Sequence, residues 1–99
     1  MQLTIQSIHF TADEKLKDYV TAKTDRLSKY FDRITAGQVY LKLTKPQAPE
    51  NKIVEIKLNV PGTTLIATEQ AATFEAATDL ATDKLKTQLR RHKEKIQSH

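Results

Sequence analysis

The chain contains no cysteine, which excludes disulfides and thiolate chemistry and favours an intracellular protein. No segment approaches the ~20 consecutive apolar residues of a membrane-spanning helix. The first residues lack the basic and apolar regions of a secretory signal. We therefore expect a cytoplasmic protein with no membrane partner.

Sequence patterns for catalysis are also missing. The only glycines, Gly37 and Gly62, are isolated, so the chain has no glycine-rich phosphate loop. The histidines are scattered along the chain, and the pair His92 and His99 lacks a third metal ligand. We predict no catalytic residue, metal site, cofactor or small-molecule substrate, and we expect His92 to lie at the edge of the core.

The composition indicates one domain over residues 1–99, with a polar tail at 97–99 that we expect to fray. Ninety-nine residues, 38% of them hydrophobic, suffice for a single core between two layers. The net charge of +4 is localised, because the stretch from Asp83 onward holds six basic residues and only two acidic ones. A basic surplus concentrated in this way suggests an anionic partner.

Apolar residues that alternate with polar ones predict four strands, at residues 3–8, 38–45, 52–60 and 63–68. The first pattern is only thinly apolar, so we expect that strand at or near an edge of the sheet. Pro61 and Gly62 mark the turn before the fourth strand, where Gly62 supplies a positive φ. On the fourth strand, Leu65 and Ala67 should face inward and Ile66 outward.

Two amphipathic helices are predicted. The first begins at a capping box of Thr11 and Glu14 and continues to about Arg33, before Gly37 ends the segment. Its expected buried residues are Leu16, Val20, Leu27, Tyr30, Phe31 and Ile34. The second begins at the N-cap Thr73. Its expected buried residues are Phe74, Ala77, Ala81, Leu85, Leu89 and Ile96.

The order of these elements, β-α-β-β-β-α, predicts an α/β (α+β) fold in two layers. Both helices should pack on one face of a four-stranded mixed sheet. The first two strands should be parallel, because a helix crosses between them. In size and layers the predicted fold is similar to double-strand RNA-binding modules.

The basic residues of the last helix border its buried stripe on both sides. At about 100° per residue, one flank holds Lys84, Arg91 and Lys95, and the other holds Lys86, Arg90 and Lys93. Three interpretations are open: a solvated charged face, a surface for a membrane or partner helix, and a nucleic-acid interface. The third is favoured, because the apolar stripe is committed to the sheet and the cations are more numerous than helix capping requires.

Lys23 falls within the apolar stripe of the first helix. Its aliphatic stem can pack there while the ammonium reaches water. Alternatively, Lys23 points into a groove between the two helices, where it would meet a phosphate. Arg26 lies close by on the same helix and would widen the basic surface.

Several segments closely resemble the ribosome hibernation promoting factors, over essentially the full length. They are residues 29–34 (KYFDRI), 83–85 (DKL), 88–89 (QL) and 92–96 (HKEKI), together with 1–3 (MQL) and 20–23 (VTAK). The resemblance implies a protein that occupies the channel between head and body of the small ribosomal subunit. There it would overlap the sites of messenger and transfer RNA and block translation reversibly.

The resemblance also implies which residues face ribosomal RNA. The matching basic positions are Lys23, Arg26, Lys84, Arg91, Lys93 and Lys95, with Lys86 and Arg90 as additional charges. Long members of the family continue into a second domain that pairs ribosomes. The present chain therefore resembles the short form, which would need a separate small partner to promote ribosome dimers.

Two alternatives come from other classes of protein. The first is a small acylphosphatase-like enzyme, for which Arg33 and Asn59 are the candidate residues. That architecture ends in a strand, whereas a long helix is predicted here. The second is a regulator that binds another protein through the exposed sheet face, at Tyr40, Lys42, Lys57 and Ile66.

Overall fold

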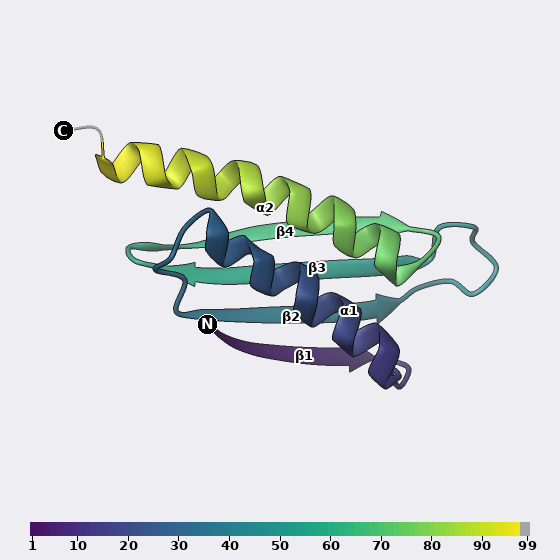
Figure 1. The fold of residues 1–99 in the computed structure, drawn as a ribbon. Helices are drawn as coiled ribbons and strands as arrows, with labels where there is room; N and C mark the ends of the chain where they lie inside the picture. The colour runs from purple at the N-terminus through teal and green to yellow at the C-terminus, as the bar shows by residue number, and fades with distance from the viewer. Residues whose placement is uncertain (98–99) are drawn as a thin grey trace.

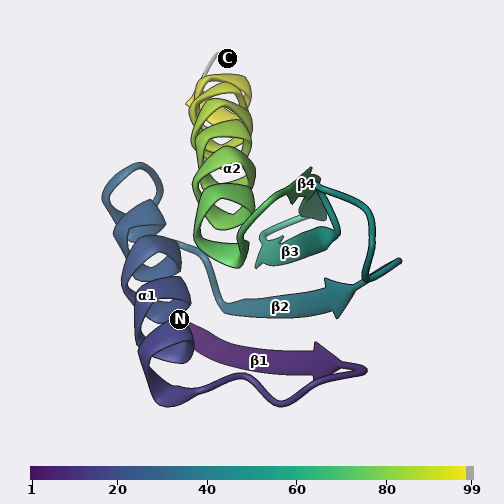
Figure 2. The same ribbon diagram turned by 90° about the vertical axis from the view of Figure 1, so that its right-hand side faces the viewer.

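The computed structural model describes residues 1–97 and confirms the predicted two-layer α+β architecture. Its elements are β1 (Gln2–Ile8), α1 (Glu14–Asp25), the 3-10 helix η1 (Arg26–Lys29), β2 (Ala36–Leu43), β3 (Lys52–Val60), β4 (Thr63–Ala71) and α2 (Phe74–Gln97). Both helices cover the same face of the sheet (Figures 1 and 2). Of the predicted tail, Gln97 is still helical, and residues 98–99 lie outside the described part of the chain.

The four strands follow one another across the sheet in the order β1-β2-β3-β4. β1 pairs with β2 in parallel, as the intervening helix requires, and the other two pairings are antiparallel. β1 is thus an edge strand, as predicted. β2 begins and ends two residues earlier than predicted, and β4 continues three residues further, to Ala71.

The core lies between the inner sheet face and one stripe of α2. Val39, Leu41, Val54, Ile56 and Leu58 are buried on the central strands. The predicted stripe of α2 is confirmed, because Phe74, Ala77, Ala81, Leu85 and Leu89 are all buried and Ile96 is partly buried. As predicted for β4, Ala67 is buried and Ile66, on the uncovered sheet face, is 48% exposed. Neither helix within residues 1–97 is long and apolar enough to cross a membrane.

The predicted capping box is wrong by two residues. Asp13 is the N-cap of α1, and its Oδ1 accepts a hydrogen bond of 2.8 Å from the backbone N–H of Leu16. Thr11 is exposed, and Ala12 is buried in the core. Burial of Ala12 places the next residue at the helix start, so that the Asp13 carboxylate receives an early N–H and complements the positive end of the helix.

We expect Asp13→Ala to lower the free energy of unfolding by about 1 kcal/mol, because it removes this cap. Thr11→Ala is the matched control and should change the stability by less than about 0.5 kcal/mol, as exposed substitutions usually do. Urea unfolding followed by circular dichroism measures both values. Equal losses of stability in the two variants would indicate that Thr11 also caps the helix.

The predicted end of the first helix is also wrong. α1 ends at Asp25, not near Arg33, and the chain tightens into η1 before it turns at Tyr30. This turn brings Phe31 against His92 of α2, with ring centroids 5.2 Å apart at 80°, and also returns the chain to β2. A straight helix to Arg33 would carry Phe31 past this contact.

Gly37 lies inside β2 and does not end a helix. A Cβ atom at this position would approach Met1 Sδ to 3.0 Å and Leu3 Cδ1 to 3.1 Å. The glycine therefore allows β1 to pack closely on β2. Gly62 has a φ of 88°, as the predicted turn requires.

Candidate nucleic-acid interface

The basic side chains of α2 divide between two sides of the helix, as its periodicity predicts. On the side facing α1 and η1, Lys86 Nζ lies 5.1 Å from the centroid of the Tyr30 ring, and Arg90 Cζ lies 5.3 Å from it. Lys93 lies one turn further along, beside Lys29. Lys86, Arg90 and Lys93 form one wall of a groove, and η1 forms the other.

The opposite side of α2 faces β4. Lys84 Nζ lies 3.1 Å from Glu69 Oε1 on that strand. Arg91 and Lys95 border a hollow of about 320 Å³ against Thr63 and Leu65. The eight basic residues predicted to bind RNA therefore do not form one surface, because α2 separates Lys84, Arg91 and Lys95 from the others.

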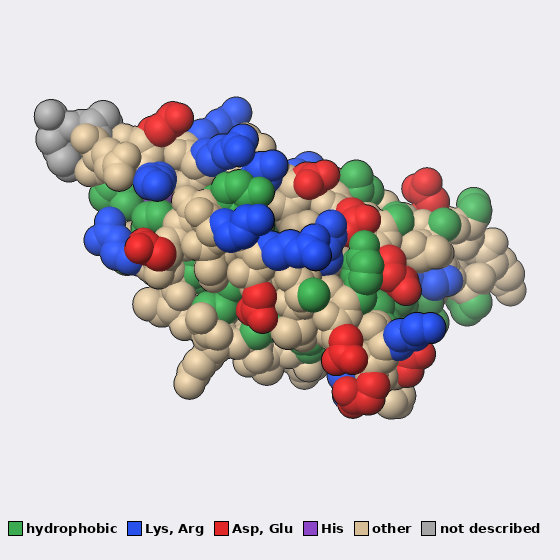
Figure 3. Space-filling model, in the orientation of Figure 1, with side chains coloured by type: hydrophobic (Ala, Val, Ile, Leu, Met, Phe, Trp, Pro, Cys, Tyr) green, Lys and Arg blue, Asp and Glu red, His purple; other side chains and the backbone are tan. Residues whose placement is uncertain are grey.

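We call the surface between the helices the interhelix groove and define it by Lys23, Arg26, Lys29, Tyr30, Lys86, Arg90 and Lys93. Three adjoining hollows of about 200, 350 and 390 Å³ make up its length, and all three share Lys29 and Tyr30. Lys and Arg side chains form a band over this face in Figure 3, with hydrophobic surface between them. The groove is thus cationic with an aromatic side chain near its centre.

Two members of the groove were not among the predicted site residues. Lys29 belongs to the KYFDRI segment but was not assigned a role, and Tyr30 was assigned to the core. The change from α1 to η1 alters the rotation per residue, so the helical period no longer places these side chains. Tyr30 is only half-buried, whereas the next residue, Phe31, is 4% exposed.

Lys23 joins the two helices through Asp79. Its Nζ lies 3.2 Å from Asp79 Oδ1, and the Tyr19 hydroxyl donates a hydrogen bond of 2.7 Å to the same oxygen. Lys23 therefore lies between the helices, and its side chain remains 30% exposed. Contact of Lys23 with phosphate stays a prediction, since its ammonium is already partly neutralised by the carboxylate.

The same contact changes the acidity of Tyr19. The hydrogen bond to Asp79, with smaller effects of burial and of the negative charges on Asp79 and Glu75, raises the pKa of Tyr19 above its ordinary value of 10.0. The folded protein thus holds the phenolic proton more tightly than the unfolded chain does. The resulting stabilisation is complete below about pH 10 and is lost as the pH rises through the folded-state pKa.

We expect the stability advantage of the wild type over Tyr19→Phe to be constant below about pH 10 and to shrink at higher pH. Urea unfolding between pH 8 and pH 11 measures it. Tyr40→Phe is the matched control, because the Tyr40 hydroxyl makes no hydrogen bond within residues 1–97. A Tyr19 advantage independent of pH would contradict the assigned hydrogen bond.

Acidic side chains gather at the other end of the helical layer. Asp13, Glu14 and Asp18 lie at the start of α1, and Glu75, Asp79 and Asp83 lie in the first half of α2. In Figure 3, several red side chains gather toward the right-hand end of this face with fewer blue ones among them, and blue side chains predominate over the rest, where single red ones also lie. An approaching polyanion would be directed toward the C-terminal half of α2.

His92 lies at the core edge, as predicted. It packs edge-on to Phe31 and is partly buried, and its buried Nε2 atom has no hydrogen-bond partner among residues 1–97. Within residues 1–97, no group of three or more His, Cys, Asp or Glu side chains is arranged to hold a metal ion.

Together, the fold and the groove define a small α+β protein with a cationic surface between its two helices. Residues 3–97 match the family described as "Sigma 54 modulation protein / S30EA ribosomal protein". The chain belongs to this family, which confirms the relationship predicted from the sequence segments.

Relatives match this chain over almost its whole length. The ribosome hibernation promoting factor of Pseudomonas putida is 40% identical over 98 residues, which cover 99% of this chain and 92% of that protein. The protein of the same name from Escherichia coli K12 is 36% identical over 99 residues and is covered completely, as is this chain.

Solved structures share the fold. The N-terminal domain of Thermus thermophilus Protein Y matches with a TM-score of 0.80 and 30% identity, covering 93% of this chain and 99% of that domain. A ribosomal subunit interface protein from Coxiella burnetii matches with a TM-score of 0.84 over 94% of this chain and 98% of the other, and its 24% identity supports the fold alone.

Proposed function

We propose that the protein is a ribosome hibernation factor that binds ribosomal RNA of the small subunit in the channel between head and body. In that position it overlaps the sites of messenger and transfer RNA and blocks translation reversibly, without catalysis. The interhelix groove is the observation that carries this proposal, because it concentrates six cations on one face of a chain from this family. A groove of this kind neutralises phosphates and gives affinity without reading base sequence.

All eight predicted basic residues remain candidates for RNA contact, and we rank them by their surroundings. Lys86, Arg90 and Lys93 face the same groove as Lys23, Arg26 and Lys29, so several phosphates of one strand can be bound together. Lys84 is already paired with Glu69. We therefore infer that the groove side of α2 contributes more to binding than the side facing β4.

Two triple variants test this inference with the same change of charge on the same helix. Lys86→Gln, Arg90→Gln and Lys93→Gln together should weaken binding to purified small subunits about 10- to 100-fold at 100 mM salt. The salt dependence, as log K against log salt, should become shallower by about 2 to 3, because up to three phosphate contacts are lost. Co-sedimentation over a range of salt concentrations measures both effects.

The matched control is Lys84→Gln, Arg91→Gln and Lys95→Gln. We expect a smaller loss of affinity and a smaller change of slope than for the groove variant. An equal or larger effect of the control would reverse the ranking of the two sides. If the wild type failed to co-sediment with small subunits at low salt, the proposed function itself would be wrong.

Promotion of ribosome dimers is a separate part of the proposal. The family resemblance suggests that a distinct small factor is needed for pairing. Gradient profiles of ribosomes with this protein alone, and with a candidate small partner, should show dimers only when both are present. Dimers formed by this protein alone would remove the need for a partner.

A further inference from the structure

We propose that Tyr30 is a stacking platform for one unpaired nucleotide of the bound RNA. This inference rests on the proposed function and makes it more specific, because it concerns the kind of RNA segment that the groove accepts. The observation behind it is an aromatic ring placed among cations at the centre of the interhelix groove.

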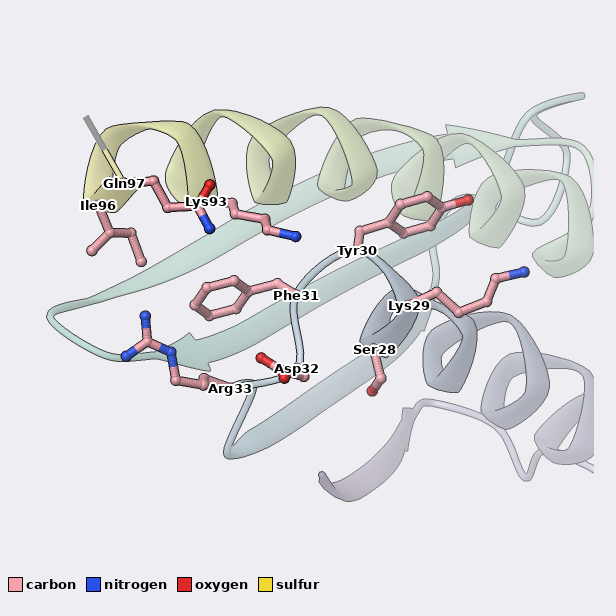
Figure 4. Close-up of a pocket in the computed structure, with 9 residues that line it drawn as sticks. All are labelled: Ser28, Lys29, Tyr30, Phe31, Asp32, Arg33, Lys93, Ile96 and Gln97. Atoms are coloured by element: carbon pink, nitrogen blue, oxygen red, sulfur yellow. The ribbon is translucent and has the colours of Figure 1, made fainter.

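The core accounts for the position of Tyr30 only in part, because the residue is half-buried at the edge of the core. Its neighbour Phe31 supplies the buried ring and contacts His92 of α2. Tyr30 instead lies along α2 in Figure 4 and lines all three hollows of the groove. Its hydroxyl makes no hydrogen bond within residues 1–97. The two adjacent aromatic residues thus have different surroundings: Phe31 lies within the core, and Tyr30 lies at the core edge and lines the groove.

The charges around Tyr30 suit a nucleotide. Lys86 and Arg90 come from successive turns of α2 and lie 5.1 and 5.3 Å from the ring centroid. Lys29 extends along one side of the ring, and Lys93 borders the hollow on the other side (Figure 4). Because both cations lie over the ring, a base that stacks on Tyr30 would displace them from the ring toward its own flanking phosphates.

Carboxylates border the groove without occupying its centre. Asp83, Asp32 and Glu94 each line a different one of the three hollows, whereas Lys29 and Tyr30 line every one. Each hollow thus has one carboxylate beside at least three cations, so its net charge is positive and favours a phosphate.

The ring also selects against duplex RNA. In an A-form helix the faces of the bases are stacked on one another and cannot be reached by a side chain, whereas unpaired nucleotides expose them. A duplex would use only the cations of the groove. Despite its two layers of helix and sheet, this protein should therefore differ from double-strand RNA-binding modules and favour loops or single strands.

Tyr30→Trp gives a direct test, because the chain has no other tryptophan. Saturation with a single-stranded ten-nucleotide RNA should quench the emission of this tryptophan through contact with a base. Inorganic polyphosphate of similar length carries charge without bases and should bind with much weaker quenching. Equal responses to RNA and polyphosphate would overturn the proposal.

Affinity measurements provide a second readout. Tyr30→Leu should bind the same RNA about 5- to 150-fold more weakly, the range for one lost base stack, with an unchanged salt slope because no charge is removed. Tyr30→Phe should bind within about twofold of the wild type. Tyr40→Leu, on the uncovered sheet face, is the control and should bind like the wild type. A duplex of equal phosphate number should be insensitive to Tyr30→Leu.

Failure of this proposal is distinguishable from failure of the proposed function. If Tyr30→Leu, shown to be folded by circular dichroism, co-sediments with small subunits as the wild type does, only the stacking platform is disproved. If the wild type does not co-sediment at all, the ribosome is the wrong partner, and the tryptophan response still decides whether the groove stacks a base.

Discussion

The packing of α2 on the sheet is the contact on which the rest of the structure depends. Alanines at the start of the helix, Ala77 and Ala81, let the backbone approach the sheet closely, and the leucines Leu85 and Leu89 fill a deeper gap further along. α2 rises away from the sheet toward its C-terminal end (Figures 1 and 2). Small side chains allow two packed layers to lie close together, and large ones hold them further apart. The change from alanine to leucine along this stripe is therefore consistent with the tilt.

This tilt explains why the first helix ends early. The space below the second half of α2 is filled by the turn after η1, whose Phe31 contacts His92. The same turn directs Tyr30 outward beside Lys86 and Arg90. The same change of backbone conformation thus places the Phe31 ring in the core and the Tyr30 ring beside the groove.

The sequence was sufficient for the features that follow from simple periods. Alternation located the four strands to within a few residues, and the helical period of α2 predicted both its buried stripe and its two cationic flanks. The parallel pairing of β1 and β2 followed from the connecting helix. These features depend on local patterns that long-range contacts leave unchanged.

Other features depend on contacts between distant segments and were missed. The N-cap at Asp13 depends on the burial of Ala12, and the position of Gly37 in β2 depends on Met1 and Leu3. The positions of Lys29 and Tyr30 in the groove depend on η1, and a helix of four residues is too short to show a repeating pattern in the sequence. The sequence left two positions open for Lys23, with its ammonium in water or in a groove between the helices. It gave no indication that Lys23 and Tyr19 share Asp79, sixty residues distant from Tyr19, as a partner.

Under the proposed function, the Asp79 contact bears on the affinity of the groove for RNA. A phosphate that approaches Lys23 must compete with a carboxylate already 3.2 Å away, so the net gain from Lys23 is the difference between two similar charge pairs. Within residues 1–97, neither Lys29 nor Lys86 forms an ion pair, so neither has to give up a carboxylate before it binds a phosphate. The hydrogen bond from the Tyr19 hydroxyl to Asp79 does not involve Lys23, so it can keep the two helices joined when Lys23 contacts a phosphate. Under the proposed function, this part of the groove carries its own competing anion, which lowers its affinity for phosphate and makes release easier.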